Sequence, residues 1–110
     1  MSLGKYKLDA RGEPIPEPDL RKWAEWCETA DRRVAKDYIG SAEVSTVFLG
    51  LDHNFSDRGN PILWETMVFG GPMNGEMHRC GGSREQAEAM HHRVLAEAQA
   101  EMGVEAGNPS

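Results

Sequence analysis

The sequence predicts an α+β fold in which a four-stranded antiparallel sheet is flanked by an N-terminal and a C-terminal helix. Two short segments, VSTVFLGL and ILWETMVF, are rich in β-branched and aromatic residues, and the turn-forming run DHNFSDRGNP separates them. Apolar residues recur at helical spacing before and after this region. A length of 110 residues suits one domain with one modest core.

The N-terminal segment, residues 4–17, combines a short alternating piece with a turn and closely spaced prolines. Tyr6 and Leu8 alternate with polar residues, and DARG at positions 9–12 is a turn signal. Prolines at positions 14, 16 and 18 keep the following chain extended. This pattern is typical of a small hairpin or of a strap across the domain.

A first helix is predicted to begin at Pro18, because proline is favoured in a first turn and Asp19 suits the positive end of the helix dipole. Its apolar face consists of Leu20, Trp23, Ala24, Cys27 and Ala30. We expect Trp23 to pack against the sheet. Trp26 lies at the edge of this face and is an interface candidate, since tryptophan is enriched at protein interfaces.

Four strands are predicted to follow. The first, residues 33–39, turns at Gly40-Ser41 into the central hairpin, whose strands are residues 44–51 and 62–69. The glycines of GGPMNG favour a tight turn, and a short last strand starts at residues 76–79.

Strand alternation divides the central hairpin into two faces that are both mostly apolar. One face carries Val44, Thr46, Phe48, Gly50, Ile62, Trp64, Thr66 and Val68, and the other carries Val47, Leu49, Leu51, Leu63, Glu65, Met67 and Phe69. Two apolar faces indicate a sheet that is covered on both sides. We expect helices on one side and a partner or further chain on the other.

A last helix is predicted after Ser83, which forms a capping box with Gln86. His91 falls on its apolar face, where a lone histidine is more often a hydrogen-bonded core residue than a ligand. Gly103 is the predicted stop. The prediction is therefore one domain over residues 4–103 and a disordered tail over residues 104–110.

The bulk composition excludes several classes of protein. A formal net charge of −6 argues against direct binding to a nucleic-acid backbone. No apolar run approaches the length of a membrane span, and the start of the chain lacks the apolar core of a signal peptide. Cys27 and Cys80 fit no metal or redox spacing, so we expect a cytoplasmic protein with free thiols and no cofactor.

A few residues are weak candidates for chemistry. Asp52 and His53, where a strand enters a loop, could bind a metal or share a proton, but a turn cap and a solvated histidine explain them as well. Glu65 is a catalytic candidate if its face is buried, with Arg33 or Lys36 as a partner. A further metal-ligand candidate is His78, which shares a strand face with Cys80.

Several strings together resemble a family of small uncharacterised proteins encoded by tailed phages and prophages. These are KLDARGEPIPEPDLRKWAEWCETADRRVA, VSTVFLGLDHNF, ETMVFGG and SREQAEAMHHRV. The resemblance implies a gene of phage origin that acts in the bacterial host cell. It implies no catalytic residues. The chain departs from the family before the last helix, where RCGGS replaces an aromatic residue, a threonine and an acidic cap.

The leading functional hypothesis is a non-enzymatic phage accessory protein that acts by protein–protein interaction and forms a homodimer. The first alternative is a metal-assisted hydrolase that uses Asp52, His53 and either Glu65 or His78, which then have to converge on one point. The second is an acidic inhibitor of a host DNA-binding protein, which needs Asp and Glu to line one face.

Overall fold

The computed structural model describes residues 4–56 and 58–106. A two-stranded antiparallel sheet contains β1 (Tyr6–Leu8) and β2 (Pro14–Pro16). The main sheet has the strand order β3-β4-β5-β6 and is antiparallel throughout. Its strands are Arg33–Ile39, Ala42–Phe48, Trp64–Phe69 and Met77–Cys80. The helices are α1 (Leu20–Thr29) and α2 (Arg84–Ala106), so the predicted α+β class and four-stranded sheet are confirmed.

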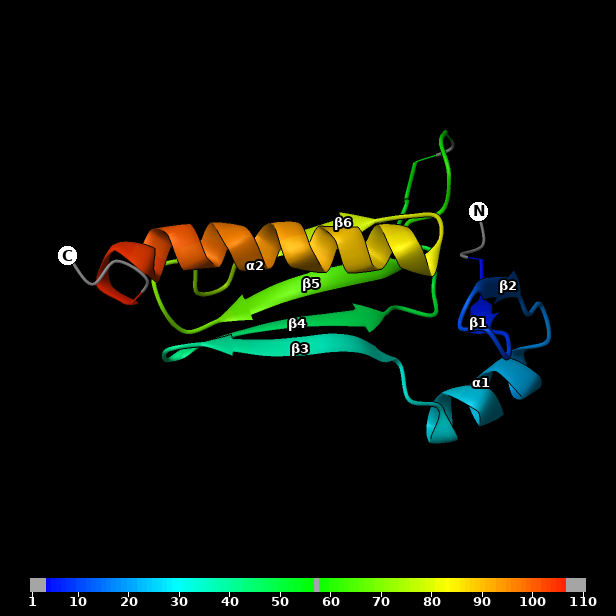
Figure 1. Ribbon diagram of the computed structural model, residues 1–110. Helices are drawn as coiled ribbons and strands as arrows, with labels where there is room; N and C mark the ends of the chain where they lie inside the picture. The colour runs from blue at the N-terminus through cyan, green and yellow to red at the C-terminus, as the bar shows by residue number, and fades with distance from the viewer. Residues whose placement is uncertain (1–3, 57, 107–110) are drawn as a thin grey trace.

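The hydrophobic core lies between α2 and one face of the main sheet (Figure 1). Alternate residues of the central strands are buried there, as the alternation predicted. The largest contributions come from Phe48 and Trp64, whose ring centroids lie 4.9 Å apart. The helix contributes Ala87, Met90, Val94 and Ala98. None of the described helices combines the length and hydropathy needed to cross a bilayer.

The first helix differs from the expectation that both helices flank the sheet. α1 lies beyond the end of the main sheet, beside the β1-β2 hairpin (Figure 1). The Trp23 indole N–H explains this position, because it donates to the carbonyl oxygens of both Tyr6 and Gly50 at 3.1 Å. Trp23 therefore packs at the junction of the hairpin and the sheet, and no residue of α1 is fully buried.

The N-terminal segment forms a hairpin, which is one of the two arrangements that the sequence left open. Lys5 and Leu51 form a β-bridge, and the Tyr6 N–H donates to the Gly50 carbonyl at 2.8 Å. The Asp52 N–H donates to the Gly4 carbonyl at 2.9 Å. The hairpin is thus attached by backbone hydrogen bonds to the residues that follow β4.

The capping box of α2 is confirmed, whereas its predicted end is wrong. Ser83 and Gln86 each accept a hydrogen bond from the other's backbone N–H, at 3.3 and 3.0 Å. The helix continues past Gly103 to Ala106, because a glycine can continue a helix at a cost of about 1 kcal/mol relative to alanine. The rest of the predicted tail, residues 107–110, lies outside the described residues.

Candidate functional site

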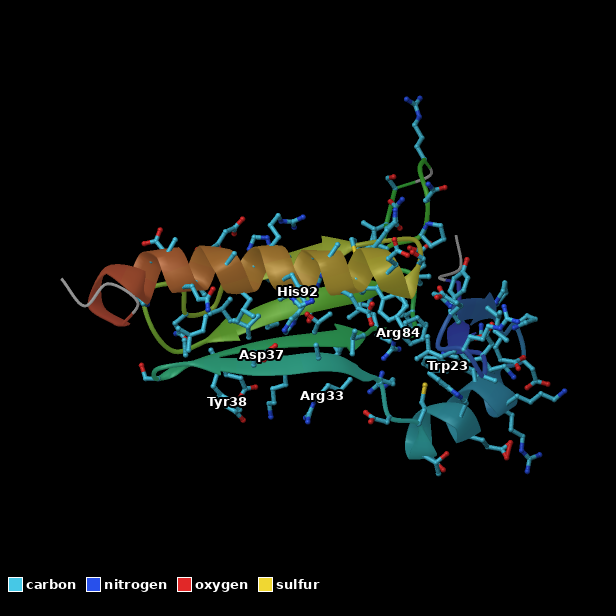
Figure 2. The ribbon with its side chains drawn as sticks, viewed as in Figure 1. Trp23, Arg33, Asp37, Tyr38, Arg84 and His92 are labelled. Carbon is cyan, nitrogen blue, oxygen red and sulfur yellow. The ribbon has the colours of Figure 1, made fainter. Side chains whose placement is uncertain are left out.

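The face of the main sheet that is turned away from α2 has no helix or strand packed over it in the described part of the chain (Figure 1). We call it the open face. In Figure 2, Arg33 and Tyr38 project from β3 on this side, and Asp37 lies on the side of α2. The strand register places these residues on the open face: Arg33, Lys36, Tyr38, Glu43, Ser45, Val47, Glu65, Met67, Phe69, Met77 and Arg79.

The open face carries exposed apolar side chains and two ion pairs. Large apolar side chains are exposed there: Tyr38 by 67%, Phe69 by 48% and Met77 by 48%. Met67 pairs with Met77 on the neighbouring strand and is itself half-buried. Phe69, Met67 and Met77 are neighbours on β5 and β6, whereas Glu43 lies between Phe69 and Tyr38. Exposed apolar surface of this kind is characteristic of an interaction site.

One ion pair joins β3 to β4 and lies between Tyr38 and the apolar residues of β5, and the other joins β5 to β6. Lys36 Nζ is 3.7 Å from Glu43 Oε2, and Arg79 Nε is 2.9 Å from Glu65 Oε2. Together with Arg33, these groups give the open face a formal charge of +1, although the whole chain carries −6. Protein interfaces likewise combine buried apolar side chains with charged groups.

Glu65, the catalytic candidate, lies on the open face and is partly exposed. Its partner is Arg79 on β6, because these two residues are directly opposite in the β5-β6 register. The expected partners, Arg33 and Lys36, are on β3 and are separated from β5 by β4. Glu65 therefore acts as one half of a surface ion pair.

Asp52 and His53 are held in the loop that follows β4. Asp52 Oδ1 accepts hydrogen bonds from the N–H groups of Asn54 at 2.7 Å and Ile62 at 2.9 Å, so this carboxylate closes the base of the loop. His53 Nδ1 lies 2.8 Å from the Leu51 carbonyl oxygen. Both side chains are therefore used to shape the loop.

The proposed metal ligands do not come together. His78 lies opposite Thr66 on the side of the sheet that faces α2, and its Nε2 is 3.3 Å from Glu76 Oε1. Glu65 is on the opposite face, and Asp52 is in the loop after β4. Among the described residues, no group of three or more His, Cys, Asp and Glu side chains could hold a metal ion.

Trp26, the interface candidate on α1, closes one end of the core. Its ring packs edge-to-face against Phe48 with a centroid distance of 5.8 Å, and the side chain is half-buried. It also lines a shallow hollow between the end of α1 and the turn of the N-terminal hairpin.

Thr66, Thr46, His91 and Asp37 form a hydrogen-bond network that the sequence did not predict. Thr66 Oγ1 is hydrogen-bonded to Thr46 Oγ1, which lies 2.8 Å from His91 Nδ1, and His91 Nε2 lies 2.7 Å from Asp37 Oδ2. The order Asp, His, Thr resembles a catalytic triad. Both threonines are 0% exposed and His91 is 1% exposed, so no substrate can reach the hydroxyl groups. The network instead joins α2 to the three strands β3, β4 and β5.

Comparison of the chain with known protein families, curated proteins and solved structures found no match. The phage resemblance therefore stays a prediction from the sequence.

Proposed function

We propose that this protein is a non-enzymatic accessory protein of phage or prophage origin, that it acts by protein–protein contact in the host cytoplasm, and that its open face joins two copies in a homodimer. The observation that carries the proposal is the apolar, uncovered face of the main sheet. The resemblance of the sequence to phage proteins supports the origin. The inaccessible Thr46 hydroxyl and the separated metal-ligand candidates give no support to catalysis.

The charge distribution favours a second copy as the occupant of the open face. This face carries +1, which leaves −7 on the rest of the chain. Two copies that meet through other surfaces bring like charges together, and like charges in contact are unfavourable. The open face avoids this repulsion, and its own basic and acidic groups can pair across a two-fold axis.

The size of the open face indicates a weak dimer. Four strands spaced by about 4.8 Å, with about six residues each at about 3.3 Å, span roughly 20 by 20 Å. Stable interfaces bury about 800 Å² per partner, which exceeds the flat area of roughly 400 Å². We therefore expect a reversible dimer whose population depends on concentration.

The acidic-inhibitor alternative has less support. It requires Asp and Glu to line one face, but arginines alternate with glutamates on the exposed side of α2. Arg84 is 3.7 Å from Glu88, and Arg93 is 3.9 Å from Glu97.

Sedimentation equilibrium over a hundredfold concentration range tests the dimer. We expect the mass to rise from monomer to dimer, and Phe69→Glu to shift the protein to monomer at all concentrations. Phe55→Glu is the matched control, because Phe55 is an exposed aromatic residue of the loop after β4 and is 64% exposed. A wild-type protein that stays monomeric, or a Phe69→Glu variant that still dimerises, contradicts the proposal.

A further inference from the structure

The two edges of the main sheet differ in how far they are protected against pairing with another chain. At one edge, β3 is interrupted by a register shift between Arg33 and Ala35 and carries Lys36 and Asp37. Bulges and charged side chains of this kind protect edge strands. At the other edge, the four-residue strand β6 pairs with β5 without a register shift and carries one charged residue, Arg79. Within the described residues, β6 has β5 as its single partner strand.

The backbone of β6 has hydrogen-bonding groups directed outward. The carbonyls of Glu76 and Cys80 point inward, because they accept from the N–H groups of Val68 and Leu63 at 3.0 Å. Successive residues of an edge strand direct their backbone groups to opposite sides. Met77 and Arg79 therefore present their N–H and C=O groups to the outside, where another strand can pair with them.

A groove of about 470 Å³ lies beside the Cys80 end of β6, between the residues that precede β5 and the first turns of α2. Its walls contain the apolar side chains of Ile62, Ala89 and Met90. Arg93 also lines the groove. It is close enough to Cys80 to lower the pKa of that thiol, against the larger effect of burial, which raises it. The groove is thus apolar, and at its side lies Arg93, whose Nε is also 3.9 Å from Glu97 Oε2 on the exposed side of α2.

We propose that the outer edge of β6 and this groove bind an extended segment of a partner protein, in which an apolar residue alternates with acidic residues. The segment adds as a further strand beside β6, with backbone hydrogen bonds to Met77 and Arg79. An apolar side chain enters the groove, and a carboxylate lies near Arg93. Met77 and Arg79 also direct their side chains to the open face, but the segment binds their outward backbone groups and the groove beside α2, so the proposal does not require the homodimer.

A second copy of β6 fits this surface less well than an acidic segment. The strand reads Met-His-Arg-Cys, so it contains no carboxylate, and its one permanently charged residue is Arg79. In an antiparallel pair of β6 strands, the carboxylate of the second copy nearest to Arg93 is that of Glu76, which precedes the strand and already lies 3.3 Å from its own His78 Nε2. The occupant that the charges favour is an acidic, apolar strand of another protein.

Two synthetic heptapeptides with blocked ends test this inference, one of alternating Glu and Val and one of alternating Lys and Val. Each is titrated into the ¹⁵N-labelled protein and followed by amide chemical shifts. We expect the Glu peptide to shift the amides of Met77, Arg79 and the groove, with at least tenfold tighter binding than the Lys peptide. Non-specific attraction to a protein with a net charge of −6 would instead favour the Lys peptide.

Three variants separate the contributions to binding. Met77→Pro removes an outward N–H, and proline is tolerated at the first residue of an edge strand, so we expect binding to be lost while the fold is kept. Met77→Ala retains the N–H and should bind within threefold of the wild type. Arg93→Ala should weaken the Glu peptide and leave the Lys peptide unchanged.

Several results overturn the inference. These are binding of neither peptide, equal binding of both, shifts confined to the open-face residues of β3, β4 and β5, or wild-type affinity in Met77→Pro. Concentration-dependent shifts of the Ala89 and Arg93 amides without peptide also overturn it, because these groove residues lie outside the open face and their shifts would identify a second copy as the occupant.

Discussion

The Nε2 atom of His91 lies 2.7 Å from Oδ2 of Asp37, and this contact ties the middle of α2 to the outermost strand β3. The imidazole is 1% exposed, whereas the Asp37 side chain is 50% exposed. The other ring nitrogen, Nδ1, is 2.8 Å from Thr46 Oγ1. Both nitrogens of this buried ring therefore have a partner, as buried polar groups require.

Replacing His91 should destabilise the protein more than replacing its neighbour. His91→Ala removes two hydrogen bonds and leaves a cavity in the core, so we expect a loss of about 2–4 kcal/mol in the free energy of unfolding. His92→Ala is the control, because His92 is exposed on the same helix, and a change within about 0.5 kcal/mol is expected. Urea denaturation measures both values. Equal losses would show that the buried contacts of His91 contribute nothing specific.

The hydrogen-bond partners also predict one tautomer for His91. An ionised carboxylate only accepts hydrogen bonds, so Nε2 must donate to Asp37, and the neutral ring then accepts from Thr46 through Nδ1. Long-range ¹H–¹⁵N NMR spectra at about pH 8 should show a protonated Nε2 and an unprotonated Nδ1. Asp37→Ala should remove this preference. Detection of the Nδ1–H form in the wild type would contradict the assignment.

The stability of the N-terminal hairpin should fall in acid. The hydrogen bond from Lys7 holds the pKa of Glu17 below its ordinary value, although burial opposes this effect. Because the folded state favours the carboxylate, its contribution is present above the unfolded pKa of about 4.3 and is lost as the pH falls through the lower folded value. Glu17→Gln should therefore flatten the decline in stability below about pH 4.5. Glu25→Gln, on the exposed side of α1, serves as the control, and an unchanged decline in Glu17→Gln would refute the assignment.

Substitution of Gly70 and of Gly75 distinguishes the cost of backbone strain from the cost of a steric clash. Gly70 and Gly75 have φ values of 86° and 89°, so alanine is strained at both positions. A Cβ at Gly70 would lie 2.5 Å from the Ser41 carbonyl oxygen, whereas a Cβ at Gly75 would meet no atom within 4 Å. We expect Gly75→Ala to cost about 1 kcal/mol and Gly70→Ala to cost about 1–3 kcal/mol more. Thermal unfolding of both variants provides the comparison, and similar melting temperatures would mean that the chain relaxes at Ser41.

Alkylation should report the environment of Cys80. Burial raises the pKa of this thiol above its ordinary value of 9.0, and Arg93 partly offsets the increase. Since the thiolate is the reactive form, the rate of reaction with iodoacetamide in a Cys27→Ser background should reach half its maximum above pH 9.0. Arg93→Ala should move this midpoint higher. A midpoint below that of a free thiol would show that Cys80 is activated.

The open face shows which part of the candidate site could be predicted from the sequence. Side chains alternate along a strand, so position alone predicts that Thr46 and Thr66 lie on one face of the sheet and Glu65 and Met67 on the other. The partner of Glu65 does not follow from position. It depends on which strand lies beside β5, and the sheet order makes that strand β6, which supplies Arg79.

By itself, the sequence determined the number and order of the main-sheet strands, the alternation along β4 and β5 and the capping box at Ser83, because these depend on local conformation and on periodicity. The predicted strands 44–51 and 62–69 are shorter at their loop ends, at Phe48 and Trp64, and Leu63 lies in the core with Trp64. Only the tertiary structure decided that Trp23 anchors α1 beyond the sheet and that Asp37, Thr46 and His91 meet in one buried chain. Such contacts join residues far apart in the sequence, and they form only after the chain has placed α2 across one face. The other face remains open because α1, held by Trp23 beside the first hairpin, does not cover it.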